Sequence, residues 1–192
     1  MTTRLVTVLL AFGANLGERA EAIDSAQREL AAHPGIFALR TSSLVETVAL
    51  RPDGPDPQAP RYLNGVALAE TELSPHALLD VLQDLETRHG RTRGEPWADR
   101  TLDIDLIQFG GRSIRDDRLT VPHPRAHERE FVLGPWLELD PDAVLIGHGR
   151  VSDLLARVHG LAPTAAQEVS AQPSAPDSVD RAPEWGAPHA TP

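Results

Sequence analysis

The sequence predicts an α+β domain built around an antiparallel sheet, and three observations carry this prediction. Short apolar stretches of strand-like composition alternate with segments whose apolar residues recur at helical spacing. Capping and turn residues separate these stretches, so most elements have a visible beginning or end. The 192 residues are also enough for one such domain with a full core, followed by a tail.

The first half of the chain predicts three strands and one helix. Residues 4–12 (RLVTVLLAF) are mostly apolar, which is typical of a strand buried on both faces. The helix that follows ends at Pro34-Gly35, and residues 36–47 predict the second strand. Residues 49–61 are so rich in Pro and Gly that we expect a long loop there. Residues 62–73 predict the third strand.

The second helix has the clearest local signals. Ser74 is a good N-cap, Pro75 suits the first helical position, and Gly90 suits the C-terminal stop. A leucine stripe between them predicts one buried face. A charged loop over residues 91–100 then leads to a fourth strand over residues 101–110.

The predicted order of elements is β-α-β-β-α-β, which is the split βαβ, or ferredoxin-like, arrangement. It is an antiparallel sheet with helices on one face, which leaves the other face free to hold a ligand. Extra C-terminal helices are expected within residues 118–141 and 151–160. We expect a domain of residues 1–161 and a disordered tail of residues 162–192, because the tail is rich in Ala, Pro and Ser and has little to bury.

Composition disfavours several classes of protein. The absence of cysteine excludes disulfides and thiolate metal sites. A net charge of −10 and an aromatic content of 4% disfavour nucleic-acid binding, including the RNA-binding use of this fold. No apolar stretch is long enough to span a bilayer and no signal-type cleavage site follows the first one, so we expect a cytoplasmic protein without a membrane partner.

Two carboxylates stand on the predicted fourth strand, within PWADRTLDIDLIQFG. Asp103 and Asp105 are two positions apart, so they share one face of the strand with Ile107, and Ile104 points to the other face. At this spacing the two side chains leave the backbone about 6 to 7 Å apart and repel each other unless a cation lies nearby. That cation is either arginine, in a structural pair, or a divalent metal, for which oxygen ligands favour Mg²⁺ or Mn²⁺.

The basic residues cluster around this pair. All 18 are arginine, and half of them fall between Arg88 and Arg129. A GC-rich genome would explain the lack of lysine but not the clustering. Because guanidinium groups match phosphate oxygens bidentately, the cluster indicates a metal–polyphosphate site in an otherwise acidic chain.

Four segments together resemble the 6-hydroxymethyl-7,8-dihydropterin pyrophosphokinase family, and the resemblance runs from residue 4 to about residue 160. They are FGANLG (12–17), RYLNGVAL (61–68), WADRTLDIDLIQFG (97–110) and LTVPHPRAHEREFVL (119–133). The resemblance implies transfer of the β,γ-diphosphate of ATP to the hydroxymethyl group of the pterin, a step of folate biosynthesis that leaves AMP. It further implies ATP as co-substrate, two Mg²⁺ ions, and a monomer whose partners are small molecules.

The resemblance also implies roles for individual residues. The residues implied in catalysis are Arg91, Arg100, Asp103 and Asp105, of which the two aspartates also bind the metal. The residues implied in ATP binding are Gln83, Glu86, Arg93, Trp97, Arg118, Thr120, His123 and Arg125. The residues implied in pterin binding are Asn15, Thr47, Leu50, Tyr62, Asn64, Arg129 and Phe131.

Simpler interpretations stay open for several of these residues. Gln83 and Glu86 also fit a solvated helix face, Trp97 fits loop packing, Phe131 fits the core, and Asn15 fits a cap-like turn. For the whole chain, the alternatives are a non-catalytic nucleotide- or pterin-binding module and a kinase that transfers a single phosphoryl group. The second alternative lacks its usual GxxxxGK[ST] loop.

Overall fold

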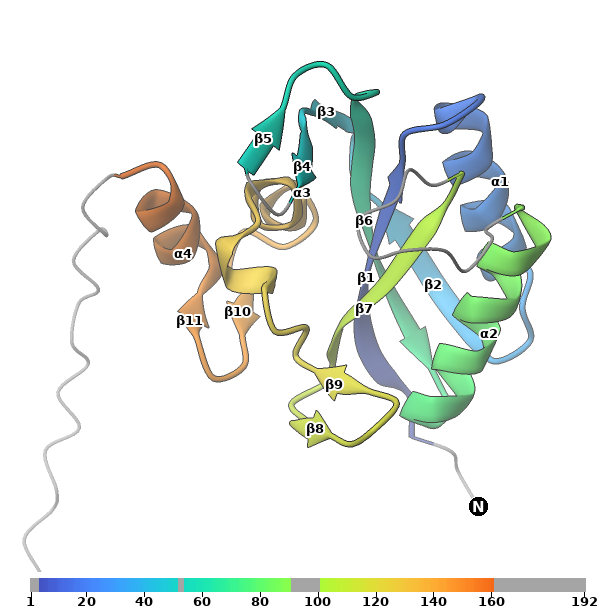
Figure 1. Ribbon diagram of the computed structural model, residues 1–192. Coiled ribbons are helices and arrows are strands. Elements are labelled where there is room, and N and C mark those ends of the chain that lie inside the picture. The colour runs from blue at the N-terminus through green and yellow to red at the C-terminus, as the bar shows by residue number, and fades with distance from the viewer. Residues whose placement is uncertain (1–3, 52–53, 91–100, 161–192) are drawn as a thin grey trace, which may run out of the picture.

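The computed structural model describes residues 4–51, 54–90 and 101–160 (Figure 1). The predicted charged loop of residues 91–100 and the predicted tail of residues 162–192 lie outside the described residues. The first half of the described chain forms β1 (Val6–Ala14), α1 (Arg19–Ala31), β2 (Ile36–Thr41), β3 (Val45–Thr47), β4 (Ala49–Arg51), β5 (Gly54–Asp56), β6 (Tyr62–Thr71) and α2 (Pro75–Arg88). The second half forms β7 (Asp103–Phe109), β8 (Ile114–Arg115), β9 (Thr120–Val121), the 3-10 helix η1 (Ala126–Glu128), α3 (Glu130–Leu139), β10 (Val144–Leu145), β11 (Gly149–Arg150) and α4 (Val151–Val158).

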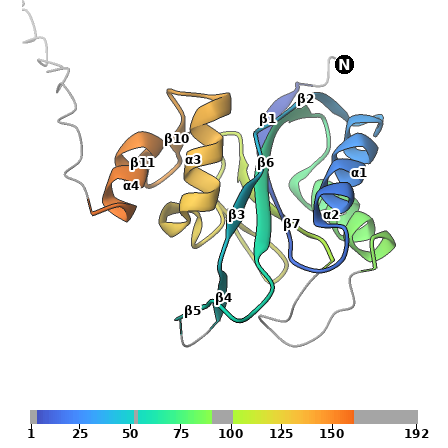
Figure 2. The ribbon, with the colours of Figure 1, turned by 90° about the horizontal axis from the view of Figure 1, so that it is seen from above.

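An antiparallel sheet in the order β2-β6-β1-β7 forms the centre of the molecule, and β3 also pairs with β6. The α+β prediction is therefore confirmed. Strand β1 lies inside the sheet, and its residues Val8 to Ala14 are buried, as the apolar stretch predicted. Helices α1 and α2 cover one face of the sheet, while α3 lies against the other, with α4 beyond it (Figures 1 and 2).

Each face of the sheet has its own apolar core. On the α1/α2 face, Phe12, Ile104 and Leu106 pack with the buried leucines of α2. On the α3 face, a second cluster contains Leu9, Ala11, Val66, Leu68, Ile107, Val132, Leu133 and Trp136, together with residues of β10 and α4. The expectation that this second face is free for a ligand is wrong wherever α3 covers it, because the strands carry apolar residues on both sides.

The predicted alternation along the fourth strand is confirmed as far as Ile107. Ile104 and Leu106 belong to the α1/α2 core, and Ile107 belongs to the α3 core. Between Leu106 and Gln108 the register of β7 against β1 shifts, so Ile107 is a bulge residue. The bulge returns Phe109 to the α1/α2 core, where strict alternation would have placed it on the α3 face.

The prediction for the second strand and the loop after it needs two corrections. Residues 36–47 form two strands, β2 and β3, separated by residues 42–44. Strand β2 also contains an irregularity, since Ala38 adopts a φ of 49° and the pairing with β6 shifts between Phe37 and Arg40. Residues 49–61 contain the β4–β5 hairpin, in which Ala49 pairs with Asp56. Gly54 adopts a φ of 118°, which residues other than glycine rarely adopt. The glycine at this position therefore serves the hairpin and does not indicate an irregular loop.

Helix α2 follows its sequence signals closely. The side chain of Ser74 accepts a hydrogen bond from the backbone N–H of Ala77 at 3.2 Å, and Pro75 is the first helical residue. Leu82 and Leu85 are buried as predicted, and Gly90 adopts a φ of 81° after the helix ends. In the described part of the chain, no helix is both long and apolar enough to cross a membrane.

Candidate active site

Three strands place one residue each in a row across the sheet. Gly13 of β1 pairs with Asn64 of β6 on one side and with Asp103 of β7 on the other. Directly paired residues of antiparallel strands project from the same face, so Asn64 and Asp103 stand on one face about 10 Å apart. Since a Cβ at Gly13 would lie only 3.1 Å from Oδ1 of Asn64, glycine is what makes room for the amide of Asn64.

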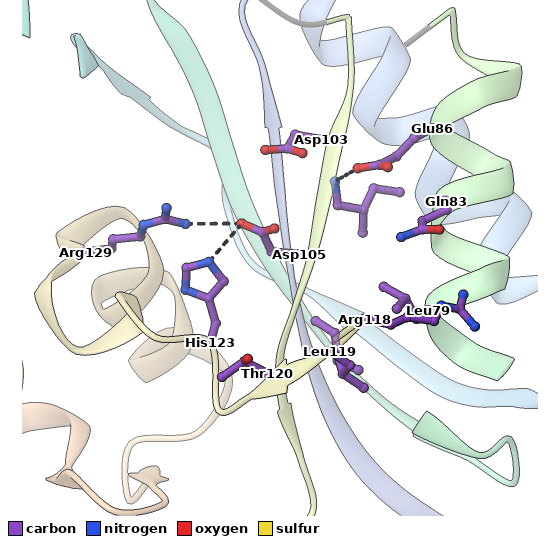
Figure 3. Close-up of a pocket in the computed structure, with 12 residues that line it drawn as sticks. Leu79, Gln83, Glu86, Asp103, Asp105, Arg118, Leu119, Thr120, His123 and Arg129 are labelled. Atoms are coloured by element: carbon purple, nitrogen blue, oxygen red, sulfur yellow. Dashed lines mark hydrogen bonds and ion pairs between the residues drawn. The ribbon is translucent and has the colours of Figure 1, made fainter. Parts of the chain in front are cut away.

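A pocket of about 380 Å³ opens along the edge of β7 (Figure 3). Both predicted metal-binding carboxylates, Asp103 and Asp105, line it and are half-buried. The residues contributed by other elements are Leu79, Gln83, Glu86, Arg118, Leu119, Thr120, His123 and Arg129. The structure thus brings seven of the predicted catalytic and ATP-binding residues to one pocket, together with Arg129.

Arg129 and His123 approach Asp105 from the side of the pocket that lies across from α2 (Figure 3). Nη1 of Arg129 donates to Oδ2 of Asp105 at 3.1 Å, and Nε2 of His123 lies 3.7 Å from the same oxygen (Figure 3). An Asp–Arg pair of this kind offsets part of the negative charge of the two carboxylates. The position of Asp105 is therefore compatible with both interpretations of the Asp pair, the structural pair balanced by arginine and the metal site.

The surroundings of His123 favour the neutral imidazole and one tautomer of it. Burial holds the pKa of His123 below its ordinary value; Arg129 and Arg125 act in the same direction, while Asp105 and Asp103 oppose them. The backbone N–H of Arg125 donates to Nδ1 of His123 at 3.2 Å, so Nδ1 is an acceptor. The ring proton then sits on Nε2, which points toward Asp105 and the pocket as a hydrogen-bond donor.

Helix α2 supplies the wall opposite Arg129. Gln83 is half-buried and Glu86 is only 5% exposed, so the solvated-helix-face interpretation is wrong for Glu86. Oε1 of Glu86 accepts a hydrogen bond from the backbone N–H of Ile104 at 2.7 Å. This bond ties α2 to β7 between the two aspartates.

The short β8–β9 segment forms the floor of the same pocket. Arg118 pairs with Asp80 of α2, and Thr120 begins β9. Asp116 accepts hydrogen bonds from the backbone N–H groups of Arg118 and Leu119, and these bonds, the first of them above all, hold the pKa of its carboxyl below the usual range. The segment that presents Arg118 and Thr120 is therefore ordered by the hydrogen bonds of Asp116 and connected to α2 through the ion pair of Arg118 with Asp80.

A second pocket, of about 590 Å³, adjoins the first, and Arg129 lines both. Thr47 and Phe131, both predicted to bind the pterin, line this second pocket. The guanidinium of Arg129 lies 5.6 Å from the centroid of the Phe131 ring. Arg125, expected on the nucleotide side, also lines this pocket and not the first.

The remaining predicted pterin residues gather at the ends of β1, β3 and β6. Nδ2 of Asn64 donates to Oγ1 of Thr47 at 2.8 Å, and Thr47 pairs with Tyr62 across β3 and β6. Asn15 is buried, and its Nδ2 donates to the backbone carbonyl of Pro60 at 3.4 Å. Because α1 begins at Arg19 with Glu18 at its N-cap, Asn15 does not cap that helix.

Five of the predicted site residues have no described side chain. Arg91, Arg93, Trp97 and Arg100 lie outside the described residues, and of Leu50 only the backbone pairing in the β4–β5 hairpin is described.

The sequence did not predict Gly13, Leu79 or Leu119 as residues of the site, although Leu79 and Leu119 line the first pocket and Gly13 lies beside Asn64. Gly13 had a detectable signal, since a glycine at the apolar end of a buried strand needs a steric reason.

The described residues contain no cluster of three or more His, Asp or Glu side chains arranged to hold a metal. Mg²⁺, however, binds through one or two carboxylates with phosphate oxygens and waters completing its shell. Asp103 and Asp105, both in one pocket, fit that donor set. The phosphate oxygens would come from a bound nucleotide.

The sequence model of the 7,8-dihydro-6-hydroxymethylpterin-pyrophosphokinase (HPPK) family matches residues 9–141 of this chain. The chain is similar to a Haemophilus influenzae protein named 2-amino-4-hydroxy-6-hydroxymethyldihydropteridine pyrophosphokinase, with 38% identity over 151 residues that cover 79% of this chain and 92% of the relative. A Pseudomonas aeruginosa protein of the same name is 40% identical over 149 residues, covering 78% of this chain and 90% of the relative.

Among solved structures, the chain is similar to Plasmodium falciparum HPPK-DHPS in complex with pteroate. The TM-score is 0.62 at 13% sequence identity, and the match covers 82% of this chain. It covers 43% of the Plasmodium chain, so this chain spans less than half of that protein. At this level of identity the likeness concerns the fold alone.

Proposed function

The chain belongs to the 7,8-dihydro-6-hydroxymethylpterin-pyrophosphokinase family, and we propose that the two pockets joined by Arg129 hold its two substrates. The protein transfers the β,γ-diphosphate of ATP to the hydroxymethyl group of 6-hydroxymethyl-7,8-dihydropterin in folate biosynthesis. The hydroxymethyl oxygen loses its proton and bonds to the β-phosphorus, the bond between that phosphorus and the oxygen it shares with the α-phosphate breaks, and AMP leaves with that oxygen. The observation that carries the site assignment is that Arg129 lines both pockets.

We assign the 380 Å³ pocket to the triphosphate of ATP and to Mg²⁺. Asp103 and Asp105 would hold two Mg²⁺ ions, which offset negative charge and stabilise the attacking and leaving oxygens when bound. Arg129 and the Nε2–H of His123 are placed to donate to phosphate oxygens on the same side. We assign His123 to this hydrogen bond and not to removal of the substrate proton.

The nucleoside end of ATP is assigned to the α2 side of the same pocket. Leu79 and Leu119 supply apolar surface there, and Gln83 supplies both a donor and an acceptor. Arg118 and Thr120 lie on the β8–β9 segment that forms the floor. These five residues would bind and orient the nucleotide so that its phosphates lie over the aspartates.

The pterin is assigned to the end of the sheet where Asn64, Tyr62 and Thr47 meet and where the second pocket begins at Phe131. Aromatic rings of Tyr62 and Phe131 suit stacking on a flat heterocycle. Asn64 offers a donor and an acceptor to the edge of the pterin. Because Asn64 and Asp103 stand about 10 Å apart on one face, the pterin and the metal-bound phosphates would meet between them.

The strand order supports a finer assignment of the fold. Numbered by their predicted order, the four main strands follow the sequence 2-3-1-4 across the sheet, as expected for the ferredoxin-like arrangement. We also propose that the protein acts as a monomer on its small-molecule substrates.

The test is an incubation of the purified protein with ATP, Mg²⁺ and 6-hydroxymethyl-7,8-dihydropterin, with separation of the nucleotide products. AMP formed only when the pterin is present is the expected result. ADP would mean that a single phosphoryl group is transferred. Intact ATP, under conditions where both ligands bind, would favour a non-catalytic binding module.

A further inference from the structure

Glu86 is a buried carboxylate on the face of α2 that packs against β7. It is 5% exposed and lies beside Leu82 and Leu85, which are also buried. Its Oε1 accepts the backbone N–H of Ile104 at 2.7 Å (Figure 3). Ile104 is the residue between Asp103 and Asp105, so the bond acts on the backbone at the centre of the Asp pair.

The position of β7 explains why this hydrogen bond matters. In the central sheet β7 is the last strand of the order β2-β6-β1-β7. Backbone N–H groups of a strand alternate between its two edges, so a strand at the end of a sheet presents every second one away from its neighbour. Glu86 takes the N–H of Ile104 on that side, where another strand would otherwise bind it.

The burial of the Glu86 carboxyl makes a passive role costly. A buried carboxylate is unfavourable unless it is hydrogen-bonded, and this one shares a pocket with two other carboxylates. The bond to Ile104 therefore contributes to the stability of Glu86 in this place and connects β7 to α2.

We infer that Glu86 is a positioning residue that fixes the backbone from which Asp103 and Asp105 project. The inference rests on the proposed function, because it takes the Asp pair as the metal ligands. It differs from the nucleotide contact that the resemblance implies for Glu86, since it acts through the strand. Loss of the bond should loosen the spacing of the two aspartates and weaken metal binding without a direct effect on the nucleoside.

Three variants separate these roles. Glu86→Gln keeps an oxygen acceptor for the Ile104 amide, whereas Glu86→Leu removes it and keeps a similar volume. Asp84→Asn is the matched control, because Asp84 is an exposed carboxylate on the same helix that pairs with Arg88. If Glu86→Leu does not fold, Glu86→Asp, whose shorter side chain withdraws the carboxylate, takes its place.

The first measurement is amide hydrogen exchange at Ile104 in the ligand-free protein. We expect exchange about tenfold faster in Glu86→Leu, close to the native rate in Glu86→Gln, and unchanged in Asp84→Asn, since loss of one such bond is worth about a factor of ten. Unchanged exchange in Glu86→Leu would overturn the inference.

The second measurement is calorimetric binding of Mn²⁺ in the presence of α,β-methylene-ATP, and of that nucleotide without metal. We expect Glu86→Leu to weaken Mn²⁺ binding about tenfold while metal-free nucleotide binding stays the same, with Glu86→Gln restoring most of the loss. The reverse pattern would mean a direct nucleotide contact and would overturn the positioning role. Failure of the proposed function would instead appear in the unmodified protein, as no AMP formed with the pterin.

Discussion

His127 and His148 stack on each other, with ring centroids 4.2 Å apart and ring planes 14° apart. The contact joins η1, which precedes Arg129, to the turn between β10 and β11. Partial desolvation holds the pKa of His148 below its ordinary value, and His127 acts in the same direction. The stack therefore favours the neutral form of His148.

This contact predicts a pH dependence of stability. Between the lowered pKa of His148 and its unfolded value of 6.5, the folded protein binds fewer protons at this residue than the unfolded chain does. The free energy of unfolding should therefore fall as pH drops below about 6.5, by a small amount because His148 is exposed. Urea unfolding of the native protein and of His148→Gln above and below this pH checks it, and identical slopes in both proteins would contradict it.

Removal of either carboxylate should abolish turnover and leave the fold intact. Asp103→Asn or Asp105→Asn keeps the side-chain shape but removes a metal-binding charge, so we expect kcat to fall by about a thousandfold or more, roughly 4 kcal/mol. Asp117→Asn, an exposed aspartate between β8 and β9, is the control and should keep its rate. Full, metal-dependent activity in either pocket variant would exclude that aspartate as a ligand.

Gly13→Ala should impair the pterin end of the site more than it impairs stability. The added Cβ would lie 3.1 Å from Oδ1 of Asn64 and 3.8 Å from Cδ1 of Tyr62, so the Asn64 amide has to shift. We expect the KM for the pterin to rise roughly tenfold, in keeping with the cost of a small misplacement. Gly111→Ala, whose Cβ would meet nothing within 4 Å, is the matched control. Equal pterin KM values in the two variants would count against a steric role for Gly13.

Phe131→Leu should weaken the pterin without changing nucleotide binding. The side chain keeps its apolar character but loses the ring, and ring stacking is worth about 0.5 to 1.5 kcal/mol. A three- to tenfold rise in the pterin Kd, on the order of that energy, is expected by calorimetry. Phe37→Leu, at an exposed position on β2, provides the comparison. A change in the Kd of ATP instead would place Phe131 on the nucleotide side.

Ser74→Ala should lower the free energy of unfolding by about 1 kcal/mol, because it removes the side-chain acceptor for the Ala77 N–H at the start of α2. Ser74→Asp keeps an acceptor and should cost much less. Urea unfolding measures both variants. A loss of equal size in both would show that the hydroxyl contributes through something other than the cap.

Local signals predicted those parts of the molecule that local chemistry determines. The caps of α2 and the alternation through Asp103, Asp105 and Ile107 follow from single-residue preferences and strand geometry. The structure places His123, expected on the nucleotide side, in one pocket with the Asp pair, whereas Arg129, expected on the pterin side, lines both this pocket and the second one.

The features that the sequence did not reveal depend on contacts between distant segments. The composition of residues 49–61 does not distinguish a hairpin from an irregular loop. Only the backbone pairing of Ala49 with Asp56 in the structure identifies the hairpin. Helix α3 covers the sheet because Val132 and Trp136 pack against apolar strand residues that are distant in sequence. Helical periodicity places Glu86 near the boundary of a polar face, and only the packing of α2 on β7 buries it against Ile104.

The position of Arg129 has a consequence for anyone who designs ligands for this protein. In the proposed assignment both substrates lie against Arg129, so we expect the binding of one to change the affinity for the other, and linkage makes any such coupling reciprocal. Whatever factor a bound nucleotide applies to the affinity of the second pocket, a compound in the second pocket applies to the nucleotide. In this assignment, we expect the potency of an inhibitor directed at either pocket to depend on the concentration of the other ligand, so potencies should be compared at a fixed concentration of that ligand.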